Sequence, residues 1–127
     1  MARYTWTVLT NAKPGMEAEY NKWYDEVHIP DVFRLKTIVA AQRFRVADWQ
    51  YLENAVTVQS SEEAVIPFRY LTIYEIETDD LPSVYRAIWA LSISGEMMIS
   101  PAIDAENFSA TTFAQVSRRF VNDQFTS

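Results

Sequence analysis

The chain has 127 residues, of which 49% are hydrophobic, 14% aromatic and 22% charged, proportions typical of a globular protein and not of a disordered segment. Eleven Lys and Arg against seventeen Asp and Glu give a formal net charge of -6, which disfavours a nucleic-acid partner because phosphate contacts need cationic side chains. No cysteine is present, which excludes disulfides and thiolate-bound metals. The length predicts one domain over residues 1–127.

Neither a leader peptide nor a membrane span is expected. The first residues, Met1 to Thr7, contain no basic segment followed by an apolar one, and no stretch approaches the roughly 20 apolar residues that a span needs. We therefore expect a cytoplasmic protein without a membrane partner. The only glycines, Gly15 and Gly95, cannot form a P-loop or a GxGxxG motif.

The first half of the chain predicts a strand, a helix and a second strand. Residues 4–10 are β-branched and aromatic and are followed by a turn at residues 11–15. Apolar residues then recur with helical spacing from Met16, and Pro30 is expected to end this helix at about His28. Alternation over residues 38–46 places Ile38, Ala40, Gln42, Phe44 and Val46 on one face of a strand, opposite Val39, Ala41, Arg43 and Arg45.

The second half predicts a strand, a helix and a strand, followed by a polar tail at residues 118–127. Residues 68–76 alternate again, Asp79 and Asp80 offer helix caps, and helical spacing continues from Leu81 to Gly95 before a β-rich run at residues 108–116. The order β-α-β-β-α-β predicts a ferredoxin-like α+β fold, a four-stranded antiparallel sheet with both helices on one face. Its other face predicts a homodimer, because an apolar face needs cover.

The connection at residues 47–67 is longer than the fold requires. Hairpin connections commonly have about 2–5 residues, whereas this one has around twenty and contains Trp49, Tyr51, Leu52 and Val56. Its apolar content predicts a lid or a dimer arm. The alternative is an insertion that packs only against the edge of its own sheet.

His28 is the strongest candidate for chemistry, because it is the only histidine and titrates near neutrality. It shares an edge of the predicted helix with Tyr24, and a carboxylate such as Asp31 is expected to favour its protonated form. It is therefore a candidate general acid or base. The alternative is that His28 caps the helix: one ring nitrogen would donate a hydrogen bond to a terminal carbonyl, and Asp31 would bond the other nitrogen. One histidine without cysteine predicts no metal site of the zinc type.

Aromatic residues and one methionine are the candidates for substrate contact. Their flat rings and hydroxyl groups suit an apolar ligand with one polar handle, although packing in the core is the alternative. Arg43 and Arg45 share a strand face that could hold a carboxylate or pair at solvent or an interface. The candidate substrate-binding residues are Trp6, Phe44, Tyr70, Tyr74, Trp89 and Met97.

The segment from Trp23 to Val32, with sequence WYDEVHIPDV, and the following Ala41-Gln42-Arg43-Phe44 resemble the dimeric α+β barrel superfamily, and EthD-like proteins in particular. Residues 70–76 and 100–104 are similar to the same group. The resemblance implies a dimer that pairs sheet to sheet, with a pocket in each subunit between the sheet and the helices. It also matches His28 to the family's histidine on the first helix.

The resemblance, taken with these residues, implies a small lyase or isomerase without a cofactor, acting on an aromatic or polyketide-like molecule. His28 would move the proton, with Tyr24 and Asp31 beside it as further catalytic residues. Three alternatives stay open: an oxygenase without a cofactor that acts on a phenol, a binding protein without turnover, and a haem binder with His28 as the axial ligand.

Overall fold

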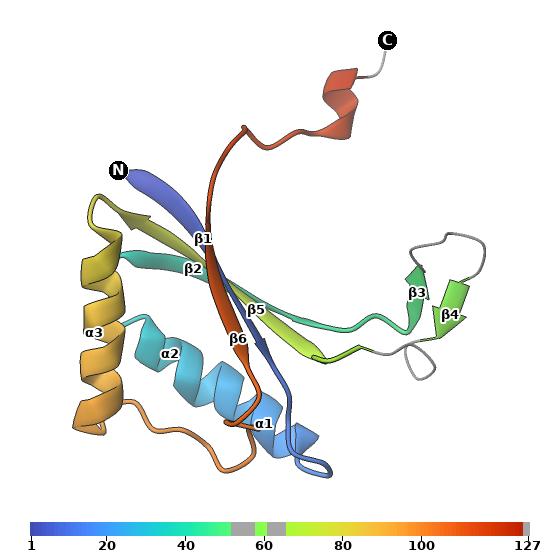
Figure 1. Ribbon diagram of the computed structural model, residues 1–127, viewed down its shortest axis with the longest axis vertical. Coiled ribbons are helices and arrows are strands. Elements are labelled where there is room, and N and C mark those ends of the chain that lie inside the picture. The colour runs from blue at the N-terminus through green and yellow to red at the C-terminus, as the bar shows by residue number, and fades with distance from the viewer. Residues whose placement is uncertain (52–57, 61–65, 126–127) are drawn as a thin grey trace.

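The computed structural model describes residues 1–51, 58–60 and 66–125. Its centre is a four-stranded antiparallel sheet with the strand order β2-β5-β1-β6. Two helical segments cover one face of this sheet (Figure 1). This arrangement is the ferredoxin-like α+β fold that the sequence predicts. The strands are β1 (Ala2–Thr10), β2 (Ile38–Arg45), β5 (Tyr70–Thr78) and β6 (Ser109–Ala114), and the helices are α1 (Glu17–Trp23), α2 (Ile29–Val32) and α3 (Leu81–Ser94).

The core lies between the sheet and the helices. Alternate residues of β1 and β5 point towards the helices, so that Trp6 lies opposite Tyr74 and Tyr4 lies opposite Ile76 in the register. Tyr74 and Ile76 are fully buried, and burying one such side chain stabilises a fold by about 1.5–3 kcal/mol. The main buried cluster consists of Val32, Ile38, Tyr74, Ile76, Val84 and Met97.

The first helical segment does not end at His28, contrary to the sequence prediction. A π-helical turn, η1 (Tyr24–His28), follows α1 directly, and α2 continues the segment to Val32. The N–H of Ile29 donates to the carbonyl oxygen of Tyr24, five residues back. Pro30 has no N–H, and its ring would clash with a carbonyl four residues back in a regular helix. The wider turn placed just before Pro30 lets the segment continue.

The second helix, α3, matches its prediction at both ends. The Asp80 carboxylate accepts a hydrogen bond from the N–H of Ser83 and caps the start of the helix. Pro82 lies in the first turn, where no N–H is needed. Gly95 follows the last turn with φ of 80°, the left-handed conformation that glycine adopts without cost. Local chemistry alone therefore sets the length of this helix.

A β-bulge in β2 changes the predicted faces of this strand. Ile38 pairs with Ile76 but Ala40 pairs with Glu75, so that one extra residue lies between these two pairs. Beyond the bulge, Ala41 and Arg43 face the helices together with Ile38, whereas Phe44 lies on the other face of the sheet. The prediction that Ile38 and Phe44 share one face was wrong, because strict alternation cannot include the extra residue.

Strand bounds differ from the predicted ones by up to two residues, and the connection at residues 47–67 contains an antiparallel pair. This pair consists of β3 (Trp49–Tyr51) and β4 (Val58–Ser60) and projects away from the helices (Figure 1). Trp49 and Tyr51 are 68% and 72% exposed, so they do not dock within a single chain. Leu52 and Val56 lie outside the described residues. The C-terminal segment also projects from the sheet and ends in a short 3₁₀ helix, η2 (Asn122–Phe125).

Candidate functional site

A cavity of about 310 Å³ lies between the helix-facing side of the sheet and the helices. This volume is near the lower end of the range for small-molecule sites, and its walls are mostly apolar, as such sites usually are. Strand β1 contributes Trp6, Val8 and Thr10, and β5 contributes Tyr74. The helical segments contribute Trp23, Tyr24, His28, Val32 and Ile88. The segment between α3 and β6 closes the remaining side with Met97, Ile99, Ile103, Asp104 and Phe108.

Strand alternation places the aromatic wall of this cavity. Trp6 and Tyr74 are cross-strand partners on the helix-facing side of β1 and β5. Their rings lie 5.1 Å apart between centroids at an angle of 35°. Pairs of this kind contribute about 0.5–1.5 kcal/mol beyond their buried area. Pairing within the sheet therefore holds this aromatic wall in place.

His28 lies in the cavity wall between two aromatic rings. It stacks on Trp23, with ring centroids 4.7 Å apart and planes at 25°, and it meets the Tyr24 ring edge-on at 5.0 Å. Within the described part of the chain, its buried Nδ1 has no hydrogen-bond partner. Nδ1 therefore does not cap a helix carbonyl, and it does not bond Asp31.

Burial controls the protonation of His28. Loss of hydration lowers the pKa of its imidazole to about 4, the charge of Asp31 raises it, and the charge of Arg43 lowers it. Asp31 favours the protonated ring, as predicted, but desolvation outweighs this attraction and leaves the pKa of His28 below its ordinary value. At neutral pH the ring is uncharged, so it is a proton acceptor and not a proton donor in the resting state.

Tyr74 supplies a second buried polar group to the same cavity. Its hydroxyl oxygen makes no hydrogen bond of regular geometry among the described residues, although Tyr24 lies close enough for a hydrogen-bonding effect on the Tyr74 pKa. Burial and the neighbouring Tyr24 raise the pKa of the Tyr74 phenol, so the hydroxyl stays protonated. A buried hydroxyl without a partner costs about 1–3 kcal/mol. A ligand oxygen that accepts this proton would recover part of that cost.

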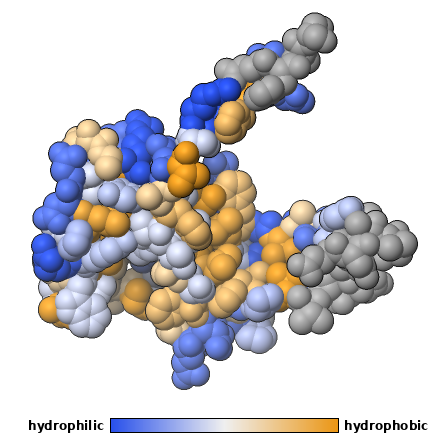
Figure 2. Space-filling model, turned by 45° about the horizontal axis from the view of Figure 1, so that its top comes forward, coloured by the Kyte–Doolittle hydropathy of each residue, from blue (hydrophilic) through white to orange (hydrophobic). Residues whose placement is uncertain are grey.

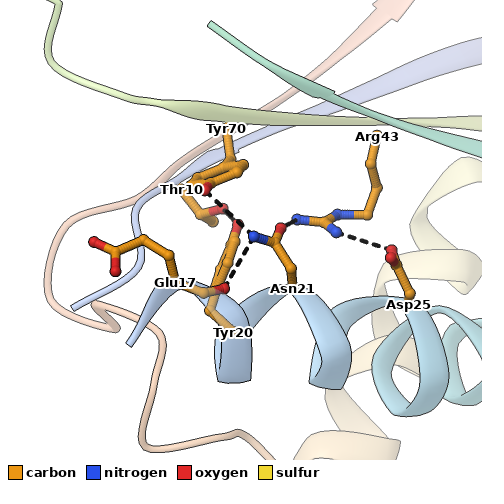
Figure 3. A network of polar contacts seen from close by, with 7 residues as sticks. All are labelled: Thr10, Glu17, Tyr20, Asn21, Asp25, Arg43 and Tyr70. Carbon is orange, nitrogen blue, oxygen red and sulfur yellow. Dashed lines mark hydrogen bonds and ion pairs between the residues drawn. The ribbon is translucent and has the colours of Figure 1, made fainter. Parts of the chain in front are cut away.

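A polar network lies beside the cavity, between β2 and the first helical segment (Figure 3). The guanidinium of Arg43 donates to Asp25 Oδ1 and to Asn21 Oδ1, both at 2.8 Å. Its carbon Cζ lies 4.4 Å from the centroid of the Tyr24 ring. Tyr20 shares a hydrogen bond of 2.5 Å with Thr10 on the same side. Arg43 thus packs against the ring of Tyr24, and the same residue also lines the cavity.

The structure brings some of the predicted site residues together and leaves others apart. Asp31 lies near His28 but does not line the cavity, and Tyr70 lies 4.8 Å from the ring of Tyr20 in the polar network. Phe44 is on the opposite face of the sheet, and Trp89 is 66% exposed on α3. Those that line the cavity are His28, Tyr24, Trp6, Tyr74 and Met97.

Several lining residues were not predicted from the sequence. Trp23 is adjacent to Tyr24 on the apolar stripe of the predicted helix, so its stripe position was a usable signal. Asp104 and Phe108 come from the irregular segment before β6. No periodicity exists in such a segment, so nothing in the sequence indicates which of its side chains turn inward.

A second cleft of about 440 Å³ lies near the ends of β1 and β2, and its walls are about equally polar and apolar. Glu17, Arg45 and Asp48 line it, and Arg45 already pairs with Asp48 at 3.7 Å. None of its described lining residues has a buried polar atom without a partner. The apolar cavity, with His28 and Tyr74, is therefore the stronger candidate site.

No protein-family model and no curated protein matches this sequence. Among the described residues, no group of three or more His, Cys, Asp or Glu side chains is arranged to hold a metal ion. No helix in the described part of the chain has the length and apolar character to cross a membrane.

Two solved structures are similar to this chain. One is an ethyl tert-butyl ether D (EthD) family protein from Bacillus halodurans C-125, with 13% identity, a TM-score of 0.55, and coverage of 91% of this chain and 100% of that one. The other is described as a dimeric ferredoxin-like protein of unknown function from Thermobifida fusca YX, with 9% identity, a TM-score of 0.51, and coverage of 90% and 92%. At these identities the similarity shows the fold. The EthD-like resemblance of the sequence is thus confirmed as a ferredoxin-like α+β fold shared with an EthD-family protein.

Proposed function

We propose that the chain is a small lyase or isomerase without a cofactor that binds a planar, largely apolar molecule in the 310 Å³ cavity and moves a proton on it with His28. One observation carries the proposal: a neutral histidine lines an apolar cavity and its buried Nδ1 has no partner. Burying a polar nitrogen without a hydrogen-bond partner destabilises the folded chain. Such groups are often found at sites that bind a ligand or accept a proton.

The low pKa of His28 assigns the order of the steps. A neutral imidazole first accepts a proton from carbon or oxygen of the substrate, and the imidazolium then returns it to another atom. Burial makes the imidazolium a strong acid, so it gives up its proton readily, either to another atom of the substrate or in exchange with solvent. The substrate would therefore be rearranged or cleaved without net loss of a proton to solvent.

Tyr74 and Tyr24 are the proposed orienting groups. The protonated hydroxyl of Tyr74 makes no hydrogen bond of regular geometry among the described residues, and it suits a carbonyl or phenolic oxygen of the ligand. Tyr24 is 1% exposed and presents its ring to both His28 and the cavity. These groups favour an aromatic or polyketide-like ketone or phenol as the substrate class.

Proton exchange on a simple ketone tests this proposal. In D₂O, we expect the protein to accelerate exchange of the acidic C1 hydrogens of 2-tetralone, measured by ¹H NMR. The variant His28→Phe keeps a ring against Trp23 but has no nitrogen, and it should lose the exchange by about 10²–10⁴-fold, the usual contribution of a positioned base. Equal exchange by both proteins would contradict the role of His28.

A binding protein without turnover is the second candidate, and the low pKa of His28 favours it. An imidazole that protonates only near pH 4 is a weak base, yet it remains a good hydrogen-bond acceptor for a ligand. In that case 2-naphthol would bind, with a dissociation constant measured by calorimetry, while 2-tetralone would show no accelerated exchange. Oxygen uptake with phenols and a Soret band with added haem test the two remaining alternatives.

We further propose that the chain forms a homodimer through the open face of the sheet. Phe44 and Phe113 are 40% and 54% exposed there, and Leu9, Leu71 and Ile73 lie between them in the register. Figure 2 shows hydrophobic side chains on the body between the two projecting segments. The dimeric description of the Thermobifida fusca protein supports a second copy as the cover. A stable monomer in sedimentation at micromolar concentration would contradict this proposal.

A further inference from the structure

Arg43 occupies a position that protein stability alone does not explain. Its side chain is 13% exposed, yet its ion-pair partner Asp25 is 61% exposed, so the cation is desolvated more than its partner. Its Nε is buried and has no partner among the described residues. A buried ion pair is weak evidence for stability, and an apolar residue of similar size is often as stable or more stable.

The contacts of Arg43 cross a junction within the first helical segment. Asn21 lies in α1, whereas Tyr24 and Asp25 lie in the π-helical turn η1. The guanidinium binds Asn21 and Asp25 with two separate N–H groups and covers the Tyr24 ring at 4.4 Å. Figure 3 shows how the side chain reaches from the strand to both polar partners. A planar guanidinium can make all three contacts at once, whereas an ammonium cannot.

Tyr24 connects this clamp to the cavity. One side of its ring is against Arg43. Its aromatic neighbours are Tyr20, at 5.5 Å and 69°, Trp23, at 5.3 Å and 71°, and His28, at 5.0 Å and 84°. Buried rings in such contact have little freedom to move separately. A change in the position of Tyr24 therefore changes the position of the His28 imidazole.

We propose that Arg43 is a positioning residue of the cavity, which holds the η1 turn and the Tyr24 ring so that His28 keeps its place in the wall. The clamp is a property of the chain itself, and its relevance to catalysis rests on the proposed function. The sequence pattern alone left Arg43 as a carboxylate binder or a surface or interface charge.

The charge of Arg43 has a second effect on the same imidazole. The charged or titratable groups around His28 are Asp31 on its own segment, Arg43 on β2, Tyr24 on η1, Tyr74 on β5, and Asp104 on the opposite wall of the cavity. Of these, Asp31 raises the pKa of His28 and Arg43 lowers it, while burial has the largest effect. Removing the Arg43 charge should therefore raise the pKa of His28.

Nuclear magnetic resonance of the single histidine tests the proposal directly. Three variants test the contributions of Arg43 separately. Arg43→Met removes both the charge and the planar guanidinium, and Arg43→Lys keeps the charge but not the guanidinium. Asp25→Asn removes the ion pair by changing its exposed partner. The matched control is Arg45→Met, because Arg45 is on the same strand and is 66% exposed. The readouts are the pH titration and chemical shifts of the His28 ring, and the binding of 2-naphthol.

We expect the titration midpoint of His28 to rise in Arg43→Met and to stay nearer the wild-type value in Arg43→Lys. The ring shifts of His28 should change in all three variants, and 2-naphthol should bind about 2- to 30-fold more weakly, the usual range for residues that act through another residue. Arg45→Met should match the wild type in each measurement.

Unchanged ring shifts of His28 in Arg43→Lys and Asp25→Asn would overturn the proposal, even if Arg43→Met does not fold. If the wild type binds no 2-naphthol and exchanges no 2-tetralone, the proposed function fails. The His28 titration and ring shifts then still decide the role of Arg43, because they need no ligand.

Discussion

Trp23 and His28 are five residues apart in the chain and their rings are stacked, with centroids 4.7 Å apart. In a regular α-helix, residues five apart point in directions about 140° apart, and such a pair would not meet. The π-helical turn from Tyr24 to His28 adds a residue to one turn and brings both rings to the cavity. The contact is therefore a product of the irregular turn and not of a helical stripe.

The pH dependence of unfolding should reveal the buried neutral His28. In the unfolded chain, His28 binds a proton near pH 6.5, whereas in the folded chain its pKa is about 4. Stability from the neutral ring is complete above pH 6.5 and is lost as the pH falls towards 4. Relative to His28→Phe, the wild type should lose about 2–3 kcal/mol over this range, as measured by urea denaturation. Parallel pH profiles for the two proteins would show that the pKa of His28 is not lowered.

Tyr74→Phe should separate ligand binding from stability. The variant removes a buried hydroxyl that makes no hydrogen bond of regular geometry among the described residues, so the free energy of unfolding should stay within about 1 kcal/mol of the wild type or rise. Binding of 2-naphthol should weaken by about 3- to 10-fold, corresponding to one neutral hydrogen bond. Tyr85→Phe is the control, because the Tyr85 hydroxyl bonds Thr112 outside the cavity and should not affect the ligand. If Tyr74→Phe and Tyr85→Phe bind 2-naphthol equally well, the Tyr74 hydroxyl does not contact the ligand.

Phe113→Ser should weaken the proposed homodimer. Phe113 is 54% exposed in a single chain and lies on the open face of β6, so a second copy would bury it. Removal of a buried phenyl group costs about 3–5 kcal/mol in a well-packed core, and an interface centre is packed similarly. Sedimentation equilibrium should show at least a tenfold higher dissociation constant. Trp89→Ser, at a residue that is 66% exposed on α3, should leave the dimer unchanged. The interface would have to lie elsewhere if only Trp89→Ser weakened the dimer.

Trp49→Ser tests whether the β3–β4 pair takes part in the dimer. A two-stranded hairpin is marginally stable alone, and the 68% exposure of Trp49 in one chain leaves its apolar ring in water. If the pair is an arm that packs on the second copy, Trp49→Ser should raise the dimer dissociation constant, and the fluorescence of Trp49 should shift to shorter wavelength on dimerisation. If Trp49→Ser and Trp89→Ser have the same dimer dissociation constant in the same sedimentation experiment, the β3–β4 pair is not a dimer arm.

Gly95→Ala should destabilise the chain by about 1–2 kcal/mol. The φ of Gly95 is 80°, and a Cβ at this residue meets no atom within 4 Å. The cost therefore comes from the left-handed backbone conformation alone and not from a clash. Thermal unfolding should show the lower stability, while 2-naphthol binding remains as in the wild type. A wild-type melting temperature would contradict the proposed role of Gly95 in ending α3.

The fold was predictable because local signals and periodicity agree along most of the chain. The cap at Asp80, the end at Gly95 and the alternation of β5 each follow from chemistry within a few residues. The π-helical turn and the β-bulge were not predictable in this way. Each adds a single residue to a regular element, and a periodic pattern read over ten residues does not detect it.

The candidate site was predictable only where it follows regular elements. Tyr24 and Tyr74 reach the cavity on the helix and strand faces that periodicity predicts, whereas His28 reaches it through the π-helical turn, which periodicity does not predict. Phe44 was placed on the wrong face by the undetected bulge, and Trp89 was named although it is not on the apolar stripe of its helix. The pKa of His28 depends on what covers the ring in three dimensions, and no spacing within the sequence contains that information.

The β-bulge between Ile38 and Ala40 determines which face of the sheet each later side chain of β2 points to. If Val39 stayed in the chain and the bulge were straightened into a regular strand, strict alternation from Ile38 would exchange the inner and outer sets from Ala40 onwards. Phe44 would then turn towards α1, and the Arg43 cation would turn to the face proposed to meet a second copy. The bulge thus determines which side chains lie on each face of β2. It places Arg43 on the face of the candidate site and Phe44 on the face of the proposed dimer interface. A relative with a regular strand of the same length in place of the bulge would need different residues on both sides of its sheet.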